Sequence, residues 1–350
     1  MSATRIPSLD GLRALSIGLV LVGHLDWTRN FPLGSPAVAD LAELGVRVFF
    51  VISGYLITTL LLGDRRRMAA GTLTRGRALG QFYVRRVYRI FPAAYFFLTI
   101  VAVLSAAGVV HLLPGDLACA ATYTTNFHQP RAWTLGHLWS LSVEEQFYVL
   151  WPAVVLFAGE RWALGVALAA LAVAPAARVL LWWAGPAFRP YVGEAFPTIF
   201  DAIAAGCVLA MTRARLLASA RYVRLTSSPA FALVPLGVLA LSQLAGRPSV
   251  DLVAGQALQN FGIALIVERC IRLPDGASGR LLNWRPLVWL GGLSYSLYLW
   301  QQLFINRHSA AWPNAFPVNV ALALAAALGS YYLVEQPFLR LRSRRATARV

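Results

Sequence analysis

The sequence predicts an all-α polytopic membrane protein with about ten transmembrane helices and no soluble domain. Of its 350 residues, 58% are hydrophobic and 13% are charged, whereas a soluble domain carries about a quarter charged residues. Long apolar runs recur from end to end, as expected for repeated membrane crossings. A soluble helical protein would need polar helix faces, which most of these runs lack.

The apolar runs define the predicted spans. The first is interpreted as a retained helix and not a cleaved signal, because it carries internal charges and no Ala-x-Ala site follows it. The stretch 114–137 is less apolar and is predicted to be an outer loop with short helical pieces, although 115–127 could form an eleventh buried segment. The ten spans are 10–27, 42–62, 90–112, 138–158, 162–183, 196–211, 230–245, 252–268, 287–306 and 316–334.

The arginines predict the orientation. All 31 basic residues are arginine, and 23 of them fall in Arg5 and in the segments 63–89, 159–161, 212–229, 269–286 and 335–350, against five in the opposite loops. The positive-inside rule then places both termini in the cytoplasm. We expect one membrane domain, 1–340, and a basic cytoplasmic tail, 341–350, against anionic lipid. Because the arginines cluster between spans, nucleic acid is not an expected partner.

The first span carries an arginine and a histidine on one face. Arg13 and His24 are eleven positions apart, about 1100° around a helix, within about 20° of three full turns. A charge in hydrocarbon costs about 2.5–3.5 kcal/mol on insertion scales, so such residues are candidates for function. His24 is a candidate general base or a structural hydrogen-bonding group. Arg13 either extends to the interface or binds a phosphate or carboxylate, and Asp10 is a candidate substrate contact.

A second group lies in "FYVRRVYRIFP", residues 82–92. Arg86 and Arg89 are three positions apart and project from one side of a helix start, Arg85 adds a third cation and Tyr83 a hydroxyl. These residues fit an ordinary cytoplasmic flank of a span. They also fit a polyphosphate site, because guanidinium groups bind phosphate oxygens in bidentate geometry.

A third group lies in "GHLWSLSVEEQFYVLWP", residues 136–152. The spacing from Ser142 to Glu145 predicts a helix N-cap with its reciprocal glutamate, which leaves Glu144 on a different face. Glu144 is a candidate for orienting the imidazole of His24 or binding a sugar hydroxyl, and Glu145 and His137 are candidate substrate contacts. No metal site is expected, since Cys119, Cys207 and Cys270 show no ligand-like spacing.

Smaller polar features accompany these groups. Ser53 and Gly54 lie within the apolar run "FFVISGYLI", where small residues favour close helix packing. The stretch "VEQPFLRLR", residues 334–342, is interpreted as a helix end, because a proline follows Glu335 and Gln336.

Six motifs in order resemble the acyltransferase family 3 membrane proteins, the O-acyltransferases of bacterial polysaccharides and antibiotic glycosides. They span nearly the whole chain: "SLDGLRALSIGLVLVGHL", "FFVISGYLI", "FYVRRVYRIFP", "HLWSLSVEEQFYVLWP", "LSYSLYLW" and "EQPF". The resemblance implies a ten-helix enzyme of the bacterial inner membrane that moves an acyl group from cytoplasmic acyl-CoA to a hydroxyl, often on a sugar. It implies no permanently bound cofactor.

The resemblance also implies roles for residues. The family's Arg-x10-His motif falls on Arg13 and His24, with the histidine as base. Its Arg-x-x-Arg motif falls on Arg86 and Arg89, and these three arginines become CoA-side or structural contacts. The remaining motif positions are Ser53, Gly54, Glu144 and Glu145. This chain departs from the pattern at Gln301, where relatives often have a histidine.

Two kinds of alternative stay open from the sequence. The intramembrane arginine, histidine and glutamates would also suit a transporter or a polymer exporter. Within the acyltransferase hypothesis, a covalent acyl-enzyme on serine or tyrosine competes with direct attack, which we expect because no nucleophile motif is evident. Some relatives carry a soluble esterase-like domain, so this chain is expected to act alone or with a separate partner. The acceptor, the acyl chain and the oligomeric state are not predicted.

Overall fold

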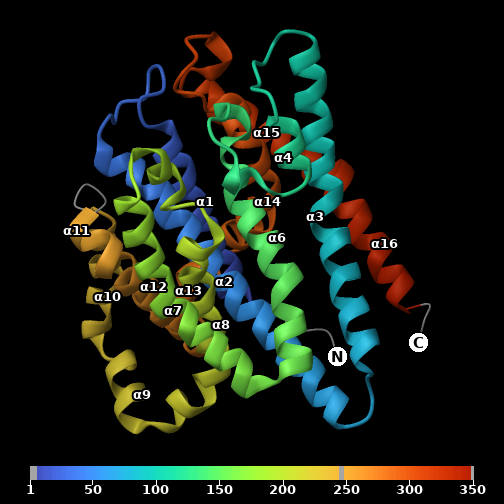
Figure 1. Ribbon diagram of the computed structural model, residues 1–350, viewed down its shortest axis with the longest axis vertical. Coiled ribbons are helices and arrows are strands. Elements are labelled where there is room, and N and C mark those ends of the chain that lie inside the picture. The colour runs from blue at the N-terminus through green and yellow to red at the C-terminus, as the bar shows by residue number, and fades with distance from the viewer. Residues whose placement is uncertain (1–5, 244–247, 348–350) are drawn as a thin grey trace.

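The computed structural model describes residues 6–243 and 248–347, and this part of the chain is a helical bundle without β-strands (Figure 1). The predicted fold class is confirmed. Long helices cross the bundle and short ones connect them. The main helices are α1 Pro7–Leu25, α2 Pro36–Ala69, α3 Arg75–Ala106, α6 Leu138–Ala153, α7 Glu160–Trp183, α8 Phe196–Ala218, α10 Leu233–Ser242, α12 Gln256–Arg272, α14 Arg285–Phe304 and α15 Val318–Ser330.

Eight of the described helices are long and apolar enough to cross a membrane, or nine if the bent pair Ala220–Ser227 and Pro229–Ser242 is one span. They coincide with nine of the ten predicted spans. The tenth, 287–306, corresponds to α14, which is long enough but too polar to belong to this group. Its serine, tyrosine and glutamine side chains are mostly buried against other helices, where they do not meet lipid.

Two helices extend well beyond the apolar runs. The segment 63–89, predicted to be a connection, is helical except at the turn between α2 and α3. Thr74 caps α3 by accepting a hydrogen bond from the backbone N–H of Arg77, so the helix starts 15 residues before the predicted span at 90. The stretch 115–127 contains only α4, Asp116–Ala121, and a 3₁₀ turn, Thr125–Phe127, so it is not an eleventh span.

The predicted helix end at Glu335 is wrong. A π-helical turn, Tyr331–Glu335, joins α15 to α16, Gln336–Thr347, and helical structure continues through it. In an α-helix a proline ring clashes with the carbonyl four residues earlier, and the wider π turn accommodates Pro337. The predicted tail is therefore helical to Thr347; positions 348–350 lie outside the described residues, as do Arg5 and Arg247.

Glycines set the closest helix contacts. A Cβ at Gly291 of α14 would lie 1.8 Å from the carbonyl oxygen of Asp10, so only glycine permits this approach of α14 to α1. A Cβ at Gly54 of α2 would lie 2.0 Å from the carbonyl oxygen of Ile203 in α8. Such small-residue contacts are typical of membrane helices, which lack a hydrophobic driving force for association.

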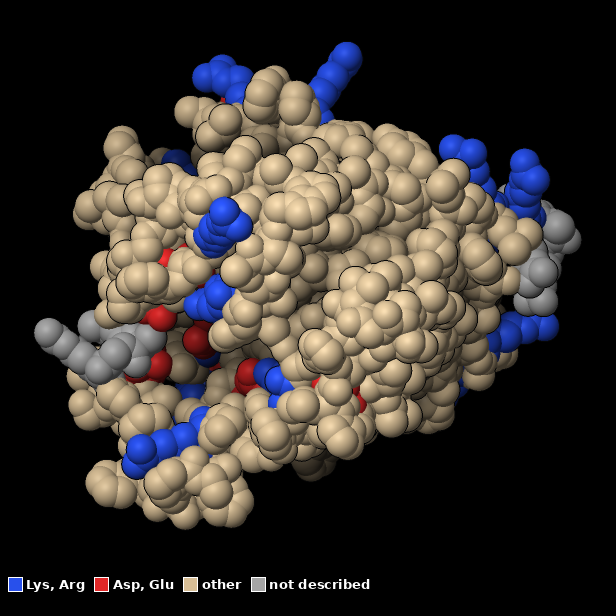
Figure 2. Space-filling model, turned by 90° about the horizontal axis from the view of Figure 1, so that it is seen from above, with Lys and Arg blue, Asp and Glu red and all other residues tan. Residues whose placement is uncertain are grey.

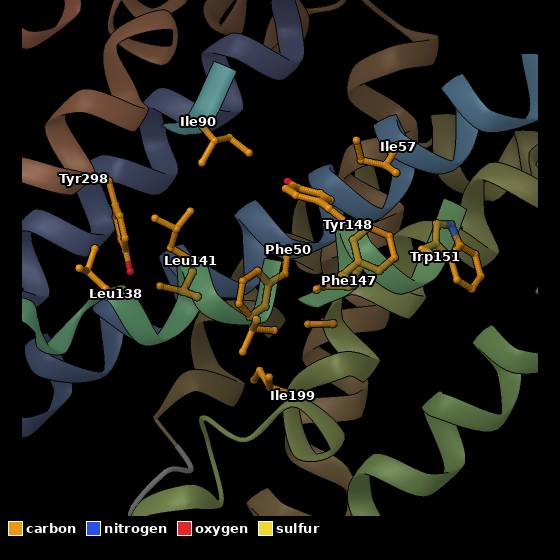
Figure 3. Close-up of a cluster of buried hydrophobic side chains, with 14 of the residues drawn as sticks. Phe50, Ile57, Ile90, Leu138, Leu141, Phe147, Tyr148, Trp151, Ile199 and Tyr298 are labelled. Carbon is orange, nitrogen blue, oxygen red and sulfur yellow. The ribbon is translucent and has the colours of Figure 1, made fainter. Parts of the chain in front are cut away.

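An apolar cluster fills the space between α2, α6 and α8. Phe147 and Trp151 of α6 stack on each other, and the Trp151 indole N–H donates to the Thr58 hydroxyl of α2 at 2.8 Å. Figure 3 shows these rings beside Phe50 and Ile57 of α2, with Tyr298 of α14 directed toward α6. This packing fixes α2, α6 and α14 relative to one another around the pockets described below.

A buried ion network lies away from this cluster. Arg178 of α7 donates to Asp201 of α8 at 2.9 Å, and both side chains are fully buried. Arg47 of α2, 1% exposed, donates to Glu43 and to Gln256 of α12, each at 2.6 Å. The charges are paired because an isolated ion at this depth would be costly. The network connects four helices on the side of the bundle remote from α3.

The connections lie at two opposite ends of the bundle. Figure 1 shows the turn between α2 and α3 and the short helix α9, Ala220–Ser227, at one end, and α4 at the other. The first end carries segments that are rich in arginine and predicted to be cytoplasmic. This arrangement agrees with the alternation assumed in the prediction, while the orientation in a membrane stays a prediction.

Candidate active site

The first of two pockets lies between α1, α2, α3, α6 and α14. We call it the inner pocket; the empty space in it, open solvent included, is about 740 Å³. Three of the predicted arginines line it, and so do two of the predicted polar residues from α2 and α6. Its polar lining is Arg13, Ser53, Arg86, Arg89, Ser140, Glu144, Tyr148, Ser294, Tyr295 and Tyr298.

The arginines of the inner pocket differ in their partners. Arg89 binds Glu335 at 2.5 Å, and Glu335 also accepts from Ser296 at 2.9 Å. Arg13 lies 3.7 Å from Asp10. Among the described residues, no carboxylate lies within ion-pair distance of Arg86, whose guanidinium lies 5.4 Å from the ring centre of Tyr148. Arg86 is thus the cation of this pocket that is most available to an anionic ligand.

Glu144 also belongs to the inner pocket. Its Oε1 accepts a hydrogen bond from the Ser53 hydroxyl at 2.6 Å. Sequence reasoning treated Ser53 and Glu144 as separate motifs 91 residues apart, and the structure joins them across α2 and α6. A carboxylate in an arginine-lined pocket can position those arginines and balance their charge.

The second pocket, which we call the outer pocket, lies at the end of α1 that carries His24. The empty space in it, open solvent included, is about 1310 Å³, and charged side chains line it. Figure 2 shows acidic and basic side chains around a hollow at this end of the molecule. The polar lining is His24, Asp40, Glu43, Gln129, Arg131, Trp133, His137, Trp139, Glu194, Tyr298, Gln302 and Arg307.

Two cations of the outer pocket are held in place. Arg131 binds Glu194 at 2.5 Å. Arg307 lies 4.7 Å from the ring centre of Trp133 and donates to the Gly23 carbonyl at 3.2 Å. Burial lowers the pKa of the Arg307 guanidinium from its ordinary value, and the nearby Asp26 carboxylate opposes that shift. Both arginines therefore contribute fixed positive charge near His24.

The two pockets adjoin. Val46 of α2 and Tyr298 of α14 line both of them. The Tyr298 hydroxyl donates to the His137 carbonyl at 2.9 Å and lies 2.5 Å from the Ser140 hydroxyl. Arg13 and His24 lie on opposite sides of this constriction, about 16 Å apart along the axis of α1. The structure thus brings the predicted shared face of α1 to two adjoining cavities.

His24 contacts two consecutive glutamines of α14. Its Nδ1 lies 2.8 Å from Gln301 Oε1, and its Nε2 lies 3.3 Å from Gln302 Nε2. Trp133 packs edge-on against the ring, with the centroids 5.5 Å apart. The partner predicted to orient the imidazole, Glu144, lies in the other pocket, and the glutamines of α14 take that position.

Four candidate residues line neither pocket. Asp10 lies near Arg13 beneath Gly291, and Gly54 is a packing contact with α8. The Tyr83 hydroxyl donates to the Val149 carbonyl at 3.0 Å. Glu145 is buried on another face of α6. Helix geometry explains the last case, since adjacent residues point about 100° apart.

The predicted N-cap at Ser142 is wrong. The helix α6 begins at Leu138, and the Ser142 hydroxyl donates back to the Leu138 carbonyl at 3.0 Å. It also accepts from the backbone N–H of Thr125 at 3.2 Å, which ties the outer loop to α6. Glu145 consequently has no capping role.

Sequence reasoning missed several residues of the site. Tyr298 and Gln302 were visible only as part of the polar stretch "LSYSLYLWQQ", and Tyr148 only as one aromatic residue among many. Arg131, Glu194 and Arg307 come from connecting segments, where no periodicity indicates which residue faces a pocket. The one available signal was the unusual polarity of a predicted span.

Comparison with known proteins gives a family match. A family model described as an acyltransferase domain, that of acyltransferase family 3, matches residues 6–335. This range includes both pockets and all the polar residues that line them. No solved structure matches the chain.

Curated relatives are similar over nearly the whole chain. One is named a putative peptidoglycan O-acetyltransferase, YrhL of Bacillus subtilis; it is 31% identical, with 95% of this chain and 54% of the relative aligned. The O-acetyltransferase OatA of Staphylococcus aureus is 27% identical, with 95% and 57% aligned. The peptidoglycan O-acetyltransferase OatA of Listeria monocytogenes is 27% identical, with 95% and 54% aligned. The chain thus spans about half the length of these relatives.

Proposed function

The chain belongs to acyltransferase family 3, and we propose that it is a membrane-bound O-acyltransferase that moves an acetyl or other short acyl group from acyl-CoA to a carbohydrate hydroxyl. One observation carries the proposal. Two adjoining pockets, which share Val46 and Tyr298 in their lining, put arginines at one end of a proposed path and a histidine at the other. A donor with a charged head and a long uncharged arm fits such a path.

The inner pocket is the proposed site for the donor. CoA carries phosphates, and Arg86 together with Arg13 supplies guanidinium groups that match phosphate oxygens. Glu335 holds Arg89 at the rim of this group. We propose that this end faces the cytoplasm, in line with the distribution of arginines, and that the protein lies in the bacterial inner membrane with both termini inside.

The chemistry proposed at the constriction is direct transfer. The acyl thioester passes Val46 and Tyr298 and reaches the ring of His24. Nε2 of His24 takes the proton of the acceptor hydroxyl, and the oxygen attacks the thioester carbonyl carbon. The C–S bond then breaks, and the thiolate of CoA takes the proton back from the imidazolium. One ester and one free thiol result, with no net proton released.

The outer pocket is the proposed site for the acceptor. It is larger than the inner pocket, and it combines carboxylates, arginines and two tryptophans. Carboxylate oxygens accept from sugar hydroxyls, and indole rings present apolar area with a polar edge. Relatives named peptidoglycan O-acetyltransferases support a sugar polymer as the acceptor class.

The test uses the purified protein in detergent with acetyl-CoA and soluble peptidoglycan fragments. We expect CoA release coupled to acetylation of the fragments, and a loss of about 10²–10⁴-fold in kcat for His24→Ala, the usual contribution of a general base. The matched control is His111→Ala, because His111 is exposed and lines neither pocket.

Two outcomes would contradict the proposal. One is a monodisperse wild-type protein that releases no CoA with acetyl, propionyl or succinyl donors. The other is transfer that survives His24→Ala at the rate of the His111→Ala control.

A further inference from the structure

We infer that Gln302 and Gln301 of α14 are positioning residues for His24. They hold its neutral ring in the tautomer that is protonated on Nδ1 and unprotonated on Nε2. The inference rests on the proposed function for its catalytic meaning. Its structural part concerns a relay of hydrogen bonds from the backbone of His137 through Gln302 to His24.

The orientation of the Gln302 amide follows from a backbone donor. The main-chain N–H of His137 can only donate, and the atom it meets at 3.0 Å is Gln302 Oε1. If the Gln302 amide were flipped by 180°, its NH₂ group would face the N–H of His137, and two donors would then face each other in a buried site. The Oε1 of Gln302 therefore faces His137, and its NH₂ group faces His24.

The tautomer of His24 follows from this orientation. The NH₂ group of Gln302 can only donate a hydrogen bond, and its nitrogen lies 3.3 Å from Nε2 of His24. Nε2 of His24 must therefore be the acceptor, with its lone pair directed at Gln302. In a neutral imidazole the proton is then on Nδ1, which donates to Gln301 Oε1 at 2.8 Å. The long contact to Gln302 is weak and can give way to an acceptor hydroxyl, whereas the short one to Gln301 keeps the ring in place.

Helix geometry allows two consecutive glutamines to contact both nitrogens of the His24 ring. Consecutive residues of α14 point about 100° apart, so Gln301 and Gln302 reach the two nitrogens of one ring from different directions. The close approach of α14 to α1 is set at their other ends, where Gly291 lies against the carbonyl of Asp10. A polar pair inside the membrane is therefore combined with glycine packing on the same helix.

The second histidine of the outer pocket cannot replace His24 as the base. Nδ1 of His137 lies 3.0 Å from Gln302 Oε1, and its Nε2 lies 3.1 Å from the Leu299 carbonyl. Both ring nitrogens already lie against protein oxygens, so neither is open to a hydroxyl of the acceptor. His137 instead supplies the backbone N–H that begins the relay.

The test compares one substitution at two adjacent positions. Gln301→Glu puts a carboxylate beside the proton on Nδ1 of His24. The proton then stays on Nδ1, and Nε2 stays unprotonated. Gln302→Glu puts a carboxylate against Nε2, which draws the ring proton there and removes the base. Both changes are isosteric and lie one residue apart on a buried helix, so each serves as the control for the other.

We expect Gln302→Glu to lower kcat by at least about 100-fold with acetyl-CoA and peptidoglycan fragments, and Gln301→Glu to remain within about tenfold of wild type. Nitrogen-15 NMR of histidine-labelled protein gives an independent readout, since the chain has only five histidines. The His24 signals, assigned with His24→Ala, are expected to show a protonated Nδ1 and a bare Nε2 in the wild type, and a protonated Nε2 in Gln302→Glu.

The outcomes separate this inference from the function. A wild-type His24 with its proton on Nε2, or equal activities for the two Gln→Glu variants, would overturn the inference even if acyl transfer occurs. A bare Nε2 without any acyl transfer would support the relay and contradict the proposed function.

Discussion

Arg85 and Arg86 are neighbours in the sequence, and the structure gives them different surroundings. Arg86 lines the inner pocket beside Tyr148, without a carboxylate at ion-pair distance in the described part of the chain. Arg85 points away from that pocket and binds Asp64 at 3.1 Å. Sequence reasoning grouped both with Arg89 as one cluster of cations. At the residue scale, the direction of a side chain decides which arginine can meet a ligand.

A pair of substitutions tests this difference. Arg86→Gln is expected to raise the KM for acetyl-CoA about 10-fold to 100-fold, because a hydrogen bond to a charged group contributes about 1.5–3 kcal/mol. Arg85→Gln should change that KM by less than about threefold, since Arg85 does not line the inner pocket and binds the buried carboxylate of Asp64 instead. Steady-state kinetics at varied acetyl-CoA provide the measurement, and equal shifts in the two variants would contradict the assignment of Arg86 to the donor.

At the scale of the element, α2 carries two glycines with opposite surroundings. A Cβ at Gly54 would lie 2.0 Å from the Ile203 carbonyl oxygen and 3.2 Å from the backbone nitrogen of Cys207, whereas a Cβ at Gly63 would meet nothing within 4 Å. Gly54 therefore defines the distance between α2 and α8. Since Ser53 is the next residue, the same contact also positions the Ser53–Glu144 hydrogen bond.

We expect Gly54→Ala to lower the melting temperature of the detergent-purified protein markedly. The added methyl group has to displace backbone atoms, and such overpacking costs about 1–3 kcal/mol or more. Gly63→Ala is the matched control on the same helix, and it should leave the melting temperature unchanged or raise it, because alanine favours the helix by up to about 1 kcal/mol. A Gly54→Ala protein as stable as Gly63→Ala would show that α2 and α8 can separate without cost.

In the molecule as a whole, the two pockets lie at different positions along α1, one at Arg13 and the other at His24, so the proposed reaction needs a defined orientation in the membrane. The distribution of arginines predicts that the turn at Thr72 is cytoplasmic and that the loop at Ala310 is outside. Both positions are exposed in the structure. The outer pocket would then receive an acceptor from the outside while the donor arrives from the cytoplasm.

Cysteine labelling tests the orientation in intact cells. In a Cys119→Ser background, which removes the one partly exposed native thiol among the described residues, a membrane-impermeant maleimide should label Ala310→Cys and not Thr72→Cys. Permeabilised cells should show labelling of both, since neither site is buried. The reverse pattern in intact cells would contradict the orientation and place the donor pocket on the wrong side.

The fold class, the position of nearly every span and the shared face of Arg13 and His24 could be predicted from the amino-acid sequence alone. Hydrophobic length and helical periodicity are local properties, so they can be read along the chain. The early start of α3 and the continuation of α15 into α16 were not predicted, because caps and π turns can override an expected helix boundary.

Which groups meet depends on how the helices pack. Ser53 and Glu144 are 91 positions apart, and His24 and Gln301 are 277 positions apart, and each pair forms one hydrogen bond. Glu144 was one candidate from the sequence for orienting His24, and the structure places two amides beside that ring instead. Contacts between helices depend on their rotation and distance, and these depend on packing at glycines such as Gly54, next to Ser53, and Gly291, ten positions before Gln301.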